Sequence, residues 1–287
     1  MVFQLNHISF SQVLTYISCP EHYLFRYVLG IKSPPAKAMK QGRAIHETLA
    51  NHYIQKRTDN RGYSQNEIQD AYEHILDKEM DEYEKELEET KKLVDKDFLA
   101  KEKEITKDEM LDAGTRGLAA YYTEINPKVQ PEFVEQEFSL ETNQNISIKG
   151  WIDLTDTKKI VHETKTSRKT PNIQEVGRDP QLAIYQIGYK KLAGKKPLGF
   201  SKDFIILGKR EAKIERFRIR KPDIDPEAML RYIWNIVKAI QNNIWYCVHP
   251  ANSWVCSKDW CGYWKLHQEL RQIGFETITK KYGKNNN

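Results

Sequence analysis

The sequence has no run of about eighteen apolar residues, the shortest that would normally be taken for a membrane-crossing helix. Its first residues, Met1 to Asn6, lack the basic-then-apolar order of a secretory signal. No segment of the chain repeats another. We therefore expect neither a membrane protein nor a solenoid, but a protein of the cytoplasm.

Cysteine is also scarce, with 4 residues in 287. In an intracellular chain this argues against a disulfide framework, because the cytosol keeps thiols reduced. Metal binding and ordinary burial remain open for these thiols. With 39% hydrophobic residues the chain can bury a sizeable core, and we expect one continuous domain over residues 1–287.

The charge is unevenly distributed. The formal net charge is +5, but residues 66–112 contain 18 acidic and 8 basic residues, a net of −10. The rest of the chain therefore carries +15, which is enough to attract a phosphate backbone. Taken alone, the same distribution fits a solvated acidic face beside an ordinary basic one equally well.

The spacing of apolar residues changes along the chain and predicts an α/β protein with a central β-sheet. A three-to-five-residue spacing among dense charges predicts a helical insertion over about 64–123, and alternation every second residue predicts the strands that follow. Helices are predicted over 13–23, 42–55, 181–192 and 226–241, and strands over 133–140, 146–154, 159–166, 200–208 and 216–220.

The most informative segment runs from Gly150 to Thr166 and reads as a β-hairpin. Glu163 and Lys165 are two residues apart on one predicted strand, so their side chains share a face. A three-residue connection at 157–159 would place Asp153 opposite Glu163, with their Cβ atoms about 4.5–5.5 Å apart. A two-residue connection would pair Asp153 with His162 and separate the carboxylates, unless a bulge intervened. Both registers remain open at this stage.

Two adjacent carboxylates repel each other, and a divalent cation relieves the repulsion by taking their oxygens as ligands. A lysine beside them could orient an attacking water or stabilise charge on a phosphate. The plain alternative is an exposed hairpin with unrelated charges. The apolar pairs Trp151-Ile152 and Ile160-Val161 argue against it, because they are too apolar for a fully exposed hairpin.

Four motifs in order resemble the PD-(D/E)XK nuclease superfamily, in particular its RecB-like and CRISPR-adaptation exonuclease branch. They are Gly42-Arg43-Ala44-Ile45-His46, Gly150-Trp151-Ile152-Asp153, Glu163-Thr164-Lys165 and Gln181-Leu182-Ala183-Ile184-Tyr185. The resemblance spans most of the chain. It implies a restriction-endonuclease-like core, in which helices flank a central mixed β-sheet.

The resemblance also implies roles for single residues. His46, Asp153 and Glu163 would bind Mg²⁺ or Mn²⁺ together with the backbone carbonyl of Thr164, and Lys165 would be the catalytic lysine. Gln181 and Tyr185 would steady the DNA strand or the lysine. Without the motifs, His46 would be read as a histidine on a packed helix, and Gln181 and Tyr185 as a helix-surface pair. Glu135 resembles a further acidic position that supports the metal site, although Glu137 alternates onto the same strand face.

The cysteines lie near both ends of the chain, the later ones in a segment over about 245–270. Iron–sulfur members of the family hold a [4Fe–4S] cluster with one early and three late cysteines. By resemblance Cys19, Cys256 and Cys261 match three of these ligands, and His267 stands where the last cysteine is common. Cys247 precedes the group. A cluster with one histidine, a zinc site and a metal-free remnant all remain open.

Together these features predict a metal-dependent DNA nuclease. The resemblance implies an exonuclease that acts on single-stranded DNA ends, in recombination, repair or phage DNA metabolism. The alternatives are a catalytically silent DNA-binding or assembly module of the same fold, and a CRISPR-adaptation partner that trims DNA. The intact set of Asp153, Glu163 and Lys165 argues against the silent module.

Overall fold

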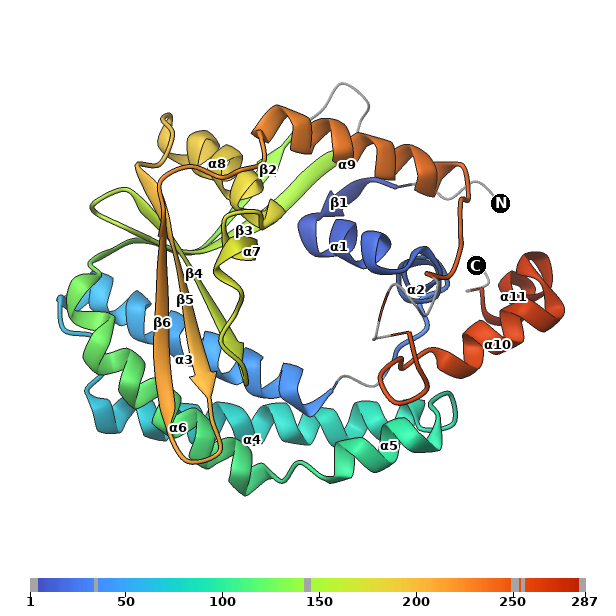
Figure 1. Cartoon of the computed structure of the whole chain (residues 1–287), viewed down its shortest axis with the longest axis horizontal. Helices are drawn as coiled ribbons and strands as arrows, with labels where there is room; N and C mark the ends of the chain where they lie inside the picture. The colour runs from blue at the N-terminus through green and yellow to red at the C-terminus, as the bar shows by residue number, and fades with distance from the viewer. Residues whose placement is uncertain (1–4, 34–35, 142–145, 249–252, 254–255, 284–287) are drawn as a thin grey trace. The chain divides into compact units, whose positions relative to one another are not determined.

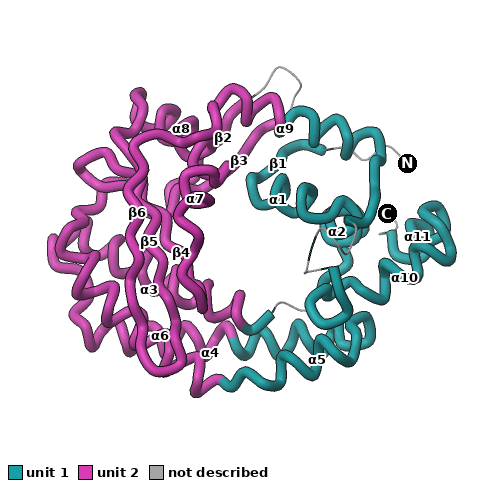
Figure 2. The backbone as a smooth tube through the Cα atoms, viewed as in Figure 1, with its two compact units in different colours: residues 1–37, 80–106, 233–287 teal, residues 38–79, 107–232 magenta. Residues whose placement is uncertain are grey.

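The computed structural model describes residues 5–33, 36–141, 146–248, 253 and 256–283. The chain forms two compact units, which Figure 2 colours separately. Each unit is assembled from segments that are far apart in the sequence. The single domain expected over 1–287 stays a prediction. Unit 1 contains residues 1–37, 80–106 and 233–287, and unit 2 contains residues 38–79 and 107–232.

Unit 2 contains a mixed β-sheet, as the sequence predicts (Figure 1). Strand β3 pairs antiparallel with β2 and with β4, β4 pairs parallel with β5, and β5 pairs antiparallel with β6. The strands are β2 (Pro131–Leu140), β3 (Ser147–Asp156), β4 (Ile160–Ser167), β5 (Gly199–Leu207) and β6 (Ala212–Ile219).

The connection between β3 and β4 has the three-residue length that the sequence left open. β3 ends at Asp156 and β4 begins at Ile160, and Lys159 in the loop adopts a left-handed φ of 64°. Leu154 pairs with His162, so continuation of this register places Asp153 opposite Glu163. The two carboxylates therefore belong to facing positions of neighbouring strands.

Helices cover the sheet of unit 2. Helix α6 packs against β5 and β6, and α8 packs against β2 and β3. Helices α4 and α9 continue into unit 1, so the helical insertion predicted over 64–123 is divided between the units. The helices are α3 (Lys37–Asp59), α4 (Gln65–Thr90), α6 (Lys107–Glu124), α7 (Ile173–Val176), α8 (Pro180–Ala193) and α9 (Pro226–Gln241), with a 3₁₀ turn η2 (Asn126–Lys128).

Unit 1 is mainly helical. Helix α1 begins with a capping box, in which Ser9 and Gln12 satisfy each other's backbone N–H groups. The hydrophobic core of unit 1 joins the early residues Leu24 and Phe25 to the late residues Tyr263 and Leu266. The elements wholly in this unit are β1 (His7–Ser9), α1 (Phe10–Ser18), α2 (Pro20–Tyr23), a π-helical turn η1 (Leu24–Val28), α5 (Lys96–Lys103), α10 (Trp264–Ile273) and α11 (Phe275–Tyr282).

Strand β5 is less apolar than its predicted central position suggests. It buries Lys202 and Asp203, which are 3% and 0% exposed. Each is paired, Lys202 with Asp179 and Asp203 with Arg216, so the buried charges are compensated. Among the helices described, none is long and apolar enough to span a membrane.

Candidate active site

Helix α3 brings His46 to the β3–β4 hairpin. A Cβ atom on Gly42 would lie 3.2 Å from Thr166 Oγ1 on β4, so the glycine lets the helix approach this strand closely. One turn later, His46 Nδ1 lies 3.7 Å from Asp153 Oδ2. His46 also hydrogen-bonds to the backbone of Thr164. The Gly-x-x-x-His spacing therefore puts an imidazole beside both a carboxylate and a peptide carbonyl.

Tyr185 on α8 lies between the two hairpin carboxylates. Its hydroxyl is 2.5 Å from Glu163 Oε2 and 3.3 Å from Asp153 Oδ1. These two carboxylate oxygens are therefore no more than about 5.8 Å apart. A tyrosine hydroxyl has one hydrogen, so it can donate to only one of these carboxylates at a time, and the contact with Glu163 is the shorter. Asp153 and Glu163 thus converge, as the three-residue hairpin connection predicts.

Lys165 completes the group of charges on β4. Its ammonium forms an ion pair with Glu163 and donates to Gln181 Oε1 at 3.2 Å. The amide of Gln181 in turn donates to the Tyr185 hydroxyl at 2.6 Å. Gln181 and Tyr185, one turn apart on α8, hold the lysine and the carboxylates in one hydrogen-bonded network.

The position of α8 follows from its sequence and its packing. Asp179 caps the helix by accepting from the Gln181 N–H at 2.8 Å, and Pro180 occupies the first helical position. Cβ atoms on Gly150 and on Gly188 would each lie 2.5 Å from the ring of Phe138. The two glycines therefore leave room for this ring between β3 and α8.

Burial and crowding disturb the acids of the site. Burial and the negative charges of Glu163 and Glu135 raise the pKa of Asp153 well above its usual range. Burial, followed by Glu163, raises the pKa of Glu135. Burial lowers the pKa of His46, which keeps the imidazole neutral and able to bind a cation. Three crowded carboxylates beside a neutral imidazole form a donor set that suits a divalent cation such as Mg²⁺ or Mn²⁺.

The structure distinguishes Glu135 from Glu137. Val134 pairs with Leu154 and Gln136 with Ile152, so Glu135 stands across from Asp153, whereas Glu137 pairs with Trp151. Glu135 adopts a left-handed φ of 46°, which is uncommon for a residue other than glycine. Alternation along the strand cannot reveal this local departure, so the sequence left both residues as candidates.

A hollow in unit 2 is lined by His46, Glu135, Asp153 and Thr164 together with apolar side chains. A larger cavity of about 520 Å³ lies in unit 1 and is lined by residues of α4 and α5, among them Tyr83 and Glu102. None of the candidate catalytic residues lines that cavity. The smaller hollow is the candidate active site, because the residues that could bind a cation line it.

Sequence reasoning missed a buried polar network next to the site. His162 Nε2 lies 3.1 Å from Asp156 Oδ2, and Arg216 donates two hydrogen bonds to Asp203, at 2.7 and 2.6 Å. His162 is also 3.9 Å from Asp203, which links the two pairs through β4 and β5. The signal in the sequence was the adjacent charged pair Lys202 and Asp203 in a strand predicted to be central and apolar. The network anchors β4, the strand that carries Glu163 and Lys165.

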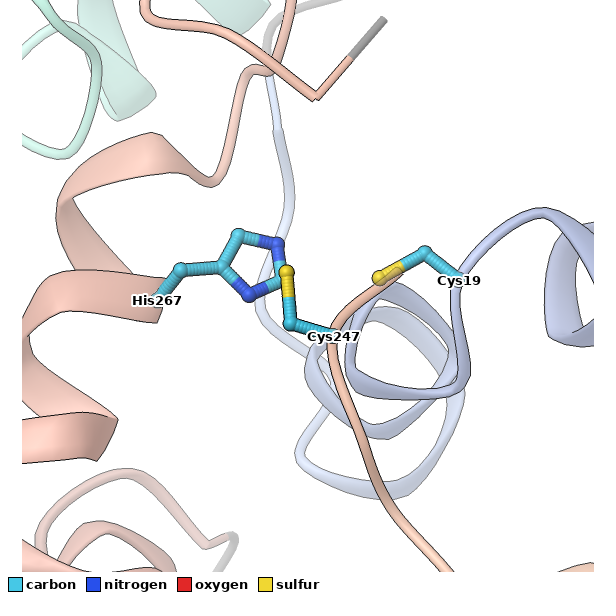
Figure 3. Close-up of side chains that lie close together, drawn as sticks. All are labelled: Cys19, Cys247 and His267. Carbon is cyan, nitrogen blue, oxygen red and sulfur yellow. The ribbon is translucent and has the colours of Figure 1, made fainter. Parts of the chain in front are cut away.

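The cysteine group lies in unit 1. The ligand atoms of Cys19, Cys247 and His267 all lie within 4.8 Å of one another (Figure 3). Cys256 Sγ is 3.7 Å from Cys247 Sγ. Neither Cys256 nor Cys261 belongs to this three-residue group: Cys256 contacts Cys247, whereas Cys261 is buried in the apolar core of the unit. Burial raises the pKa of Cys247 to about 11, so without a cation its thiol stays protonated.

A family model and several solved structures are similar to this chain. The family model described as the PD-(D/E)XK nuclease superfamily matches residues 7–266. No curated protein matches the chain. Among solved structures, a "Putative exonuclease" from Eubacterium rectale has 9% identity, a TM-score of 0.47, and coverage of 83% of this chain and 82% of its own. The structure of SSO0001 has 21% identity, a TM-score of 0.32, and coverage of 49% and 68%.

The family match covers nearly the whole chain, including the hairpin, the helix of His46 and the helix of Tyr185. The mixed sheet with flanking helices is the restriction-endonuclease-like fold that the sequence predicted. The chain belongs to the PD-(D/E)XK nuclease superfamily.

Proposed function

We propose that this nuclease is a Mg²⁺- or Mn²⁺-dependent deoxyribonuclease that acts on single-stranded DNA from a free end. The observation that carries the proposal is the convergence of Asp153 and Glu163, within about 5.8 Å, beside the ammonium of Lys165. His46, Asp153, Glu163 and the Thr164 carbonyl would hold the cation. When bound, such a cation lowers the pKa of a water molecule and polarises the scissile phosphate.

The side chains around the proposed cation would each have a role in cleavage. Glu163 pairs with Lys165 and so keeps the ammonium at the carboxylates, where it can face a phosphate oxygen. Although burial favours its neutral form, the charge of Glu163 raises the pKa of Lys165, so this lysine acts as a cation rather than as a base. Gln181 and Tyr185 limit the movement of Lys165 and Glu163 through their hydrogen bonds.

Trp151 supports a single-stranded substrate. It lies two residues from Asp153 on β3, so the two side chains leave the strand on the same side. It is 47% exposed, so its indole is accessible to a ligand. Two residues of a strand span about 7 Å, close to one nucleotide of an extended strand, so an unpaired base could stack on the indole beside a phosphate at Asp153. A base within a duplex is already stacked and paired.

The net charge of +15 outside residues 66–112 supports a nucleic-acid partner. The preference for an end rests on the family resemblance alone. The silent binding module is disfavoured because Asp153, Glu163 and Lys165 are not only present but also connected through Tyr185 and Gln181.

The test is cleavage of labelled linear and circular single strands, and of a matched duplex, with Mg²⁺ or Mn²⁺. We expect cleavage of the linear single strand, and its loss in Asp153→Ala and Lys165→Ala. Glu135→Gln should weaken cleavage, whereas Glu137→Gln on the same strand serves as the matched control. Equal cleavage of circles would overturn the end preference, and unchanged cleavage in both alanine variants would place the activity elsewhere.

A second experiment separates substrate choice from catalysis. Trp151→Ala should raise KM for single-stranded DNA with little change in kcat, because stacking would contribute about 1–3 kcal/mol to binding. Trp151→Phe retains an aromatic face and should keep most of the affinity. An equal loss in both variants would refute a stacking role.

A further inference from the structure

We propose that Cys19, Cys247, Cys256 and His267 form a tetrahedral site for a single zinc ion in unit 1. This ligand set differs from the four-cysteine [4Fe–4S] arrangement that the family resemblance implies, because it includes Cys247 and omits Cys261. The inference is independent of the proposed DNA cleavage, since none of these residues belongs to the hairpin site.

The first argument is the separation of the ligand atoms. With Zn–S bonds of about 2.3 Å, two sulfurs of a regular tetrahedron lie about 3.8 Å apart. Cys247 Sγ and Cys256 Sγ are 3.7 Å apart, which matches this edge. The sulfurs of Cys19 and Cys247 and a ring nitrogen of His267 lie within 4.8 Å of one another (Figure 3). Cys256 is outside this three-atom group and adjoins it through Cys247, so a shift of its side chain would bring all four ligands around one ion.

The second argument is the support of His267. Its Nδ1 atom lies 2.6 Å from Glu21 Oε2, and both side chains are buried. This contact leaves Nε2 as the ring nitrogen for a ligand, on a side chain with a ring nitrogen within 4.8 Å of the Cys19 sulfur. A carboxylate that holds the second nitrogen of a ligating histidine is the usual support of a zinc site, because it sets the tautomer and the ring orientation.

The cluster fits these residues poorly. In a [4Fe–4S] cluster each thiolate binds a different iron atom at the corner of a cube, so the sulfurs lie farther apart than around one ion. A cluster that used both Cys247 and Cys256 would need their sulfurs farther apart than 3.7 Å. Cys261, which the resemblance assigns to the cluster, packs instead with Phe25 and Leu266 in the apolar core.

The site would join parts of unit 1 that are distant in the sequence. Cys19 lies at the junction of α1 and α2, and His267 lies on α10. A zinc ion held by both would crosslink the early and late segments, and its binding free energy would add to the stability of the unit. It would be a structural ion, with four protein ligands and no open position for chemistry.

The test is metal and sulfide analysis of the full chain purified without oxygen, supplemented in one arm with Zn²⁺. We expect one zinc per chain and no acid-labile sulfide. Replacement of zinc by Co²⁺ should produce the thiolate-to-cobalt absorption and the tetrahedral visible bands. Cys247→Ser should lose both signals, whereas Cys261→Ser should retain them and serves as the matched control.

Glu21→Gln provides a milder variant for the case in which a cysteine variant does not fold. It keeps the side-chain size and should weaken zinc binding about 10- to 100-fold in competition with a chelator. Iron with sulfide in the purified chain, zinc retained by Cys247→Ser, or no zinc bound in the supplemented arm would each overturn the proposal. Asp153→Ala should keep its zinc, which separates this result from failure of the proposed nuclease activity.

Discussion

Replacement of Asp153 by asparagine is expected to stabilise the metal-free protein while it abolishes DNA cleavage. Asp153 lies within about 5.8 Å of an oxygen of Glu163 and across from Glu135. In the absence of a cation these negative charges repel one another, and burial adds a desolvation cost. Asparagine keeps the shape of the side chain and removes its charge.

The magnitude follows from the distance. Two unit charges no more than about 5.8 Å apart in a medium of effective dielectric constant about 20 repel each other by about 3 kcal/mol or more. The ammonium of Lys165 offsets part of this repulsion. We therefore expect a net gain of about 1–2 kcal/mol, or an increase in Tm of about 2–8 °C for a unit of this size.

The gain should depend on pH. The pKa of Asp153 is raised in the folded state, so the folded protein binds this proton more tightly than the unfolded chain does. The metal-free wild type therefore loses stability as the pH rises from the ordinary carboxyl range through the raised pKa. The advantage of Asp153→Asn should be absent below about pH 4 and should grow as the pH increases.

The assay is thermal unfolding in a chelating buffer over this pH range, repeated with Mn²⁺. The wild type should gain stability with Mn²⁺ and the variant should gain much less, because it has lost a ligand. Glu137→Gln, on the exposed part of β2, is the control and should change neither measurement. A metal-free Asp153→Asn protein that is less stable than the wild type at neutral pH would refute the reasoning.

Four further substitutions test other parts of the site. Lys165→Met should reduce single-turnover cleavage about 100- to 10,000-fold with unchanged circular dichroism, and a smaller effect would remove the ammonium from the mechanism. Tyr185→Phe should weaken the apparent Mn²⁺ affinity about 10-fold or more, since the carboxylates lose their bridging hydroxyl; unchanged affinity in a metal titration would contradict this. Arg216→Met should cost about 3–5 kcal/mol in urea unfolding because it removes the guanidinium that compensates the buried charge of Asp203, whereas Lys213→Ala on the same strand should cost less than about 1 kcal/mol. Gly150→Ala should cost about 1–3 kcal/mol in the same measurement, because its Cβ would lie 2.5 Å from Phe138, and a neutral effect would show that the ring moves freely.

Much of the fold could be predicted because local patterns and tertiary contacts agree in unit 2. The alternation of residue types predicted strands over 133–140 and 159–166, and the structure has strands over Pro131–Leu140 and Ile160–Ser167. The helix predicted over 226–241 has the same bounds in the structure. By contrast, the buried charges Lys202 and Asp203 require partners from elsewhere in the chain, so their pairing was not predictable from β5 alone.

In the candidate active site, too, some features follow from the sequence and others only from the tertiary structure. The sequence alone determined which residue types were available, the alternation that puts Glu163 and Lys165 on one side of a strand, and the helical spacing of Gln181 and Tyr185. Only the tertiary structure decided the hairpin register and the choice of Glu135 over Glu137, because both depend on backbone angles in a loop and at a strand irregularity.

The cysteines depend most strongly on tertiary structure. Spacing along the chain grouped Cys256 with Cys261, but folding turned Cys261 into the apolar core and brought Cys247 to Cys19 and His267. Periodicity constrains neighbours along a helix or strand, whereas contacts between segments more than 200 residues apart follow from how whole elements pack. The sequence therefore determined the local chemistry of this protein, and the packing of its elements decided which distant groups meet.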